Sequence, residues 1–127
     1  MSRPWSVLIV DDNRDAGDLL GEVLAALGYS IRVVHDSNAA LAAVEQLVPD
    51  AALLDIGLPE IDGYELARML HERWPALCLI AITGYGQPAD RERALATGFT
   101  AHMTKPVSIT DLVATLELYC GNTPSRG

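Results

Sequence analysis

Three carboxylates, a hydroxyl and an ammonium group each follow a short apolar run in this sequence. They belong to Asp11, Asp12, Asp55, Thr83 and Lys105. Carboxylates hold divalent cations or act as nucleophiles, whereas a hydroxyl or an ammonium donates hydrogen bonds to an anion. Three carboxylates and one ammonium leave a net charge of −2, which one divalent cation neutralises. Oxygen ligands in a partly hydrated octahedral shell favour magnesium.

Each of these features has an ordinary structural explanation when it is taken alone. An Asp-Asp pair before a helix usually caps that helix, and Thr83 beside Gly84 is typical of a turn. Lys105-Pro106 is likewise typical of a surface turn. Only their convergence in one crevice favours a chemical site, because clustered like charges cost free energy unless something offsets them.

The elements that would bring these residues together alternate regularly along the chain. Helical periodicity separates five short apolar runs, and Gly28 and Pro75 stand where two of the helices should end. We predict strands at 5–10, 29–34, 51–54, 77–82 and 99–103, and helices at 16–27, 40–48, 62–74, 88–97 and 109–120.

This order predicts an α/β fold of the flavodoxin-like (βα)5 type, with a parallel five-stranded sheet in the order 2-1-3-4-5. The first, third and fourth strands are almost continuously apolar, so we expect helices on both faces of the sheet in a three-layer sandwich. Ligands of such sheets bind outside the carboxyl ends of the strands. All five candidate residues follow strand ends, so we expect them in one crevice.

The bulk composition limits the classes of function. The 127 residues fit one domain, and we expect 1–120 to form it and 121–127 to be a polar tail. A formal charge of −8 and a pI of about 4.6 argue against direct nucleic-acid binding, which depends on clustered Lys and Arg. Without an apolar stretch of roughly 20 residues or a signal peptide, the protein is expected to be cytoplasmic. We expect a monomer or weak dimer.

The two cysteines and two of the histidines have ordinary structural explanations. Neither Cys78 nor Cys120 is predicted to be half of a disulfide framework or of a metal site, and Cys78 is expected to pack in the core. His35 and His71 are expected to be ordinary surface residues, without carboxylates at ligand spacing.

Over residues 5–120 the sequence resembles the receiver domain of response regulators. The resemblance is carried by Val7-Leu8-Ile9-Val10-Asp11-Asp12-Asn13, Leu53-Leu54-Asp55-Ile56-Gly57-Leu58-Pro59, Asp62-Gly63, Thr83-Gly84 and Lys105-Pro106. It implies that Asp55 is the phosphoacceptor and that magnesium is held by Asp11, Asp12, Asp55 and the backbone carbonyl of Gly57. It also implies that Lys105 pairs with the phosphoryl group and that the bond before Pro106 is cis.

The implied reaction is transfer of a phosphoryl group from a histidine kinase or a histidine phosphotransfer protein to Asp55, followed by hydrolysis. Such a domain catalyses only its own phosphorylation and dephosphorylation, so it is not a conventional enzyme. In the family, a hydroxyl residue moves toward the phosphate, an aromatic residue of the fifth strand turns inward, and the fourth helix, fifth strand and fifth helix form the output face. Thr83 matches the hydroxyl residue of this switch.

The aromatic position falls on His102, where the family more often has Tyr or Phe. Two interpretations remain open. His102 either fills the aromatic role, with a charge that responds to pH, or is an exposed strand residue at an interaction face.

The resemblance leaves alternatives. A haloacid-dehalogenase-like phosphatase also combines an Asp nucleophile with magnesium, but its Asp-x-Asp motif differs from the adjacent Asp11 and Asp12. A dinucleotide-binding module is disfavoured because the first strand–helix turn lacks a Gly-x-Gly signature. A degenerate receiver that only binds partners is disfavoured by the intact acidic and Lys positions. The chain is either a stand-alone regulator or part of a larger protein such as a hybrid histidine kinase, and its downstream target is not indicated.

Overall fold

The computed structural model describes residues 4–57, 63–83 and 97–120. Its five strands form one parallel sheet in the order β2-β1-β3-β4-β5, as predicted. The strands are β1 (Ser6–Val10), β2 (Ser30–Val34), β3 (Ala51–Asp55), β4 (Cys78–Thr83) and β5 (Ala101–Thr104). The helices are α1 (Arg14–Ala26), α2 (Ser37–Gln46), α3 (Gly63–Arg73) and α5 (Ile109–Tyr119).

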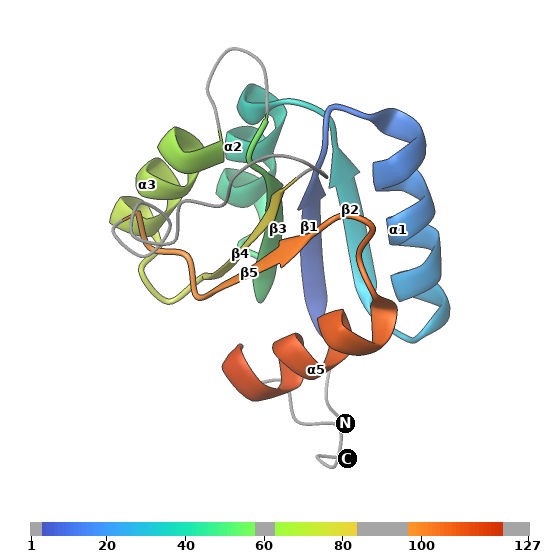
Figure 1. The fold of residues 1–127 in the computed structure, drawn as a ribbon. Coiled ribbons are helices and arrows are strands. Elements are labelled where there is room, and N and C mark those ends of the chain that lie inside the picture. Colours follow the sequence, from blue (N-terminus) through green and yellow to red (C-terminus); the bar gives the residue numbers. More distant parts are fainter. Residues whose placement is uncertain (1–3, 58–62, 84–96, 121–127) are drawn as a thin grey trace.

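Helices cover both faces of the sheet, so the molecule has three layers (Figure 1). One face packs against α2 and α3 through a core that includes Leu8, Leu54 and Leu70. The other packs against α1 and α5 through Ile9, Leu53 and residues such as Leu112. Alternate side chains of the same strands enter different cores, which explains why β1, β3 and β4 are apolar on both faces.

Short polar caps begin several helices and determine where the loops turn. Asn13, Asp36 and Ser108 are the N-caps of α1, α2 and α5, and each side chain accepts a bond from a backbone N–H of the first turn. Gly28 follows α1 with a φ of 103°, a conformation that favours glycine. The helix predicted at 88–97 lies outside the described residues apart from Thr97, and so does Asp62, where the helix predicted at 62–74 begins.

The prediction for the two cysteines was wrong in one respect. Cys78 is buried in the core as expected, but it forms a disulfide with Cys120, with the two Cα atoms 5.6 Å apart. Cys78 begins β4 and Cys120 is the C-cap of α5, and both contribute to the core between the sheet and that helix. A packing arrangement between elements 42 residues apart leaves no local pattern in the sequence.

Candidate metal centre

The loop after β1 presents two carboxylates without using either as the helix cap. Asn13 is the N-cap of α1, and its Oδ1 accepts from the N–H of Ala16 at 3.1 Å. Asp11 is 7% exposed, and its Oδ1 accepts from the N–H of Asn13 at 2.9 Å, whereas Asp12 is exposed. Neither Asp11 nor Asp12 is therefore the N-cap of α1, which leaves both carboxylates to the crevice at the end of the sheet.

The end of β3 presents the third carboxylate. Asp55 is 7% exposed, and its Oδ1 accepts from the N–H of Gly57 at 2.9 Å. The first residue of α3, Gly63, lies directly against this segment, because a Cβ added there would be 2.6 Å from the Asp55 carbonyl oxygen and from Ile56 Cα. Only a residue without a side chain permits this approach, and it supports the backbone that carries Asp55.

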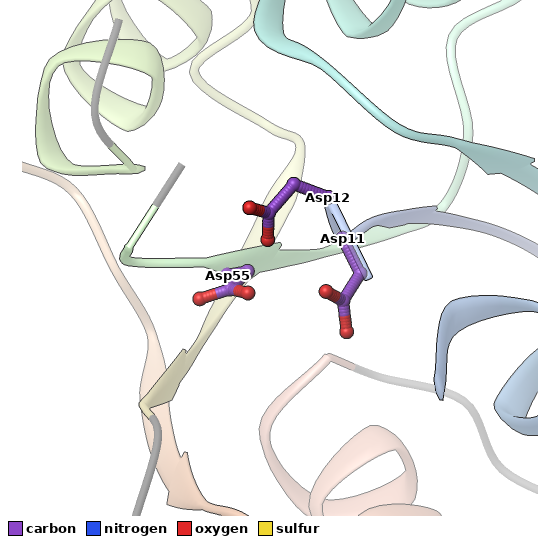
Figure 2. A group of neighbouring side chains, drawn as sticks. All are labelled: Asp11, Asp12 and Asp55. Atoms are coloured by element: carbon purple, nitrogen blue, oxygen red, sulfur yellow. The ribbon is translucent and has the colours of Figure 1, made fainter. Parts of the chain in front are cut away.

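The carboxylates of Asp11, Asp12 and Asp55 face one common space (Figure 2). Each offers an oxygen atom, and these oxygens all lie within 4.8 Å of one another. The register pairs Val10 of β1 with Leu54 of β3, so Asp11 and Asp55 follow neighbouring positions at the same edge of the sheet. The sequence prediction that these three residues converge is confirmed.

Lys105 completes the polar cluster from the other side of the crevice. Its Nζ lies 3.1 Å from Asp11 Oδ2 and 3.3 Å from Asp55 Oδ2. Its backbone N–H donates to the Thr83 carbonyl at 2.8 Å, and the following bond to Pro106 is cis, as the resemblance implied. The loop after β5 therefore directs the ammonium group toward both buried carboxylates.

The charges in this cluster affect one another. Burial raises the pKa of Asp11, assisted by the Asp55 charge, although the Asn13 N–H bond and the pairing with Lys105 act in the opposite direction. For Lys105, burial lowers the pKa, but its bond to Asp11 and the attraction of both carboxylates outweigh that effect, so the pKa is raised. The Lys105 ammonium therefore stays charged at neutral pH. Its pairing with Asp11 does not fully offset the effect of burial on that carboxylate, whose pKa remains raised.

Thr83 lies at the end of β4 and is 1% exposed. Its Oγ1 lies 3.1 Å from Nε2 of His102, 3.4 Å from the Met103 carbonyl oxygen and 3.5 Å from the Thr104 hydroxyl. All three contacts are on β5, so the hydroxyl is turned toward that strand. His102 is half-buried, and its ring contacts the Thr83 hydroxyl.

Sequence reasoning missed the environment of His35. The prediction of an ordinary surface residue was wrong, because its Nδ1 lies 3.0 Å from the Asp11 carbonyl oxygen and its Nε2 lies 3.5 Å from Asp18 Oδ1. The position directly after β2 was the available signal, since strand ends surround the crevice. His71, by contrast, is exposed as predicted.

An apolar cavity of about 530 Å³ adjoins the acidic cluster. One wall comes from α1, including Leu19, Leu20 and Val23, and another from the segment after β5, including Val107. Asp11, Asp55 and Lys105 also line it, so the cavity connects an apolar surface to the polar site.

The donor set fits a hard divalent cation. Three carboxylates and one ammonium leave a charge of −2, and the oxygens are close enough to share one ion. Asp12 is exposed, so a cation held by these residues would stay accessible to water ligands, as magnesium prefers. The pKa of Asp11 is raised because burial disfavours its negative charge more than Lys105 stabilises it, and a cation would stabilise that charge further.

Comparison with known proteins agrees with this geometry. A family model described as the response regulator receiver domain matches residues 7–117. The chain belongs to this family. It is 31% identical over 121 residues to the polar-differentiation response regulator DivK of Brucella anthropi, covering 94% of this chain and 98% of DivK. It is 35% identical over 113 residues to the transcriptional regulatory protein TrcR of Mycobacterium tuberculosis, covering 89% of this chain but only 44% of TrcR.

Solved structures agree with the fold. The CheY-like response regulator receiver domain protein of Methanospirillum hungatei superposes with a TM-score of 0.85 at 30% identity, covering 93% of this chain and 94% of that one. The chain thus spans nearly all of some relatives and about half or less of others.

The receiver domain is therefore a phosphoacceptor of two-component signalling, with an acidic pocket formed by Asp11, Asp12 and Asp55. Its family is one of signalling domains rather than conventional enzymes, and membership implies a histidine kinase as partner. Within the part of the chain that the structure describes, no helix is long and apolar enough to cross a membrane. An origin in a hybrid kinase, one of the two alternatives for this chain, is not shown by these relatives.

Proposed function

We propose that Asp55 accepts the phosphoryl group and that Mg²⁺ is held by Asp11, Asp12, Asp55 and the backbone carbonyl of Gly57. The observation that carries this proposal is the position of Lys105, whose Nζ lies between Asp11 and Asp55 at 3.1 and 3.3 Å. Both buried carboxylates adjoin the ammonium and the cation site, and Asp55 is assigned as the acceptor because it is the one that matches the phosphoacceptor position of the receiver family.

The chain's own residues supply orientation and charge. The Gly57 N–H bond and the contact of Gly63 with the backbone fix the Asp55 carboxylate in one orientation. Lys105 exchanges part of its contacts with Asp11 and Asp55 for one with a phosphoryl oxygen, and the Thr83 hydroxyl binds a second phosphoryl oxygen. The bound cation neutralises the charge that develops on the transferring group.

The transfer step is a substitution at phosphorus. One Asp55 carboxylate oxygen forms a bond to phosphorus while the P–N bond of the phosphohistidine breaks, and the donor imidazole keeps that electron pair and takes up a proton from water. Hydrolysis of the resulting acyl phosphate returns the carboxylate and releases inorganic phosphate. The side chain changes from −1 to about −1.5 to −2 on phosphorylation.

This added charge is the proposed signal. Thr83 turns from β5 toward the phosphoryl group, and His102 follows in the role that an aromatic residue has in the family. Support comes from the direct contact between the two side chains at 3.1 Å. The output face would then include β5 and α5, and the fourth helix of this face lies outside the described residues.

The phosphodonor is proposed to be a histidine kinase or a histidine phosphotransfer protein that packs against the apolar cavity beside the site. Leu19 of α1 is 62% exposed and lines this cavity, so a partner could bury it while presenting its phosphohistidine to Asp55. Because histidine kinases transfer their phosphoryl groups in the cytoplasm, the cytoplasmic location remains our prediction. Magnesium as the bound metal is likewise part of this proposal.

The experiment is incubation of the chain with a small acyl phosphate, with and without Mg²⁺, followed by intact-mass measurement. We expect one added phosphoryl group in the wild type with Mg²⁺, and none in Asp55→Asn or in the presence of a chelator. Asp15→Asn is the matched control, because Asp15 is an exposed carboxylate of α1 outside the cluster.

Labelling of Asp55→Asn to the wild-type level would refute the assignment. Sustained hydrolysis of small phosphate esters by the wild type would instead favour the phosphatase alternative.

A further inference from the structure

The β1–β2 ladder ends in an unusual way beside the acidic cluster. The two strands pair from Ser6 with Ser30 to Val10 with Val34, and the N–H of Asp11 continues the pattern by donating to the Val34 carbonyl at 3.2 Å. In a regular parallel ladder, the Asp11 carbonyl would next accept from the backbone N–H of Asp36.

Asp36 has left the sheet at this point. It is the N-cap of α2, and its side chain accepts from the N–H of Ala39 at 2.7 Å. The side chain of His35 occupies the place of the missing donor, with Nδ1 3.0 Å from the Asp11 carbonyl oxygen. A carbonyl oxygen only accepts, so Nδ1 carries a proton and donates it. Val34 thus binds the backbone N–H of Asp11, and the next residue, His35, binds its carbonyl oxygen.

The imidazole is itself held in place. The His35 side chain is 19% exposed, and its Nε2 lies 3.5 Å from Oδ1 of Asp18 in the N-terminal half of α1. The ring therefore lies between the backbone of Asp11 and the first helix, with one nitrogen toward each. This arrangement limits the ring to the orientation that directs Nδ1 at the carbonyl.

We propose that His35 is a positioning residue for the cation site, acting on Asp11 through its backbone carbonyl. The Asp11 carboxylate is held by the N–H of Asn13 and by Lys105, but Lys105 must give up part of this contact when a cation and a phosphoryl group enter. The His35 bond is independent of that exchange, so it keeps the Asp11 backbone in place. The inference rests on the proposed function, since it assumes that Asp11 is a metal ligand.

The test is the Mg²⁺ affinity of the unphosphorylated chain, measured from amide chemical shifts of residues 11–13 and 55–57 during titration. His35→Asn retains an N–H donor at the position of Nδ1, whereas His35→Gln places its amide one bond farther, near Nε2. We expect His35→Gln and His35→Leu to weaken Mg²⁺ binding about tenfold, as loss of an outer hydrogen bond to a metal ligand commonly does. His35→Asn is expected to stay within about threefold of the wild type.

Two measurements separate positioning from a general loss of structure. The melting temperature without Mg²⁺ is expected to differ little between the Asn and Gln variants, so different affinities report the donor position. His71→Leu, an exposed histidine of α3, is the control and should bind Mg²⁺ as the wild type does.

Equal affinities for the wild type, His35→Gln and His35→Leu would overturn the role of His35 while leaving the proposed function intact. Equal weakening in the Asn and Gln variants would also overturn it, because the donor position would then be irrelevant. Absence of Mg²⁺ binding by the wild type would overturn both proposals.

Discussion

The hydroxyl of Thr83 and the imidazole of His102 are in direct contact, with Oγ1 of the first 3.1 Å from Nε2 of the second. They lie on the neighbouring strands β4 and β5, where Ala81 pairs with His102 and Thr83 with Thr104. In the proposed switch, the hydroxyl turns from this contact to a phosphoryl group on Asp55, and the ring is released from Thr83.

The first prediction concerns this release. On addition of Mg²⁺ and beryllofluoride, a phosphate mimic, the ring signals of His102 in NMR spectra should shift together with the amide of Thr83. His102→Phe should preserve the response of α5 amides, because the ring still fills the space, whereas His102→Ala should remove most of it. Phosphorylation by a small acyl phosphate should change less than about threefold in both variants, since His102 does not touch Asp55. Unmoved His102 signals in a protein whose Asp55 region responds would exclude it from the switch.

The second prediction links metal binding, stability and pH. Mg²⁺ at about 100 times its dissociation constant should add about 2.7 kcal/mol to the free energy of unfolding, or roughly 10 °C in melting temperature. The pKa of Asp11 is raised in the metal-free fold, so protonated Asp11 contributes to the free energy of unfolding. This contribution is fully present at pH values below the unfolded pKa near 3.8. That contribution is lost as pH rises through the folded pKa, so at neutral pH the ionised carboxylate is a cost that Mg²⁺ relieves.

The increase in the free energy of unfolding that Mg²⁺ causes should be full at pH 7 and shrink as pH falls toward 4. Asp11 must be deprotonated to bind the metal. Calorimetry across this range measures it. Asp12→Asn should lose most of the gain at every pH, and Asp15→Asn should behave as the wild type. A gain that does not depend on pH would contradict the assignment of Asp11 as a ligand.

The third prediction tests where the phosphodonor binds. Leu19→Asp places a charge on the wall of the apolar cavity and should slow transfer from a phosphorylated histidine kinase at least tenfold, which corresponds to about 1.4 kcal/mol of lost contact. Transfer from a small acyl phosphate should change less than twofold. Leu47→Asp is the control, because Leu47 is 73% exposed at the end of α2, on the opposite face of the sheet. Similar slowing by both variants would show that the cavity has no special role.

The fourth prediction concerns the disulfide between β4 and the end of α5. Closing a loop between residues 42 positions apart should stabilise the oxidised chain by about 2–4 kcal/mol, mainly by restricting the unfolded state. Reduction should lower the melting temperature of the wild type and leave Cys120→Ser unchanged. Denaturant unfolding with and without a dithiol reductant measures the difference. Equal stabilities of oxidised and reduced wild type would show that the bond adds nothing.

The sequence alone was sufficient for the architecture and for the main site. Continuous apolar runs identified β1, β3 and β4 as strands covered on both faces, and right-handed crossovers between parallel strands leave few possible orders. In any such sheet the carboxyl ends of the strands share one edge, so Asp11 and Asp55 had to meet there, with Thr83 at the end of the next strand. Strand direction and topology decide this result, and both follow from local patterns.

Only the tertiary structure decided which side chains support that site. The contact of His35 with Asp11 exists because α2 begins at its Asp36 cap, which takes the backbone away from the end of the β1–β2 ladder. The pairing of Cys78 with Cys120 depends on how α5 lies across the sheet. The place of His35 after a strand predicts that it lies near the crevice, but which atom it contacts depends on the register and packing of the elements. Periodicity only places a residue on a face of its own element.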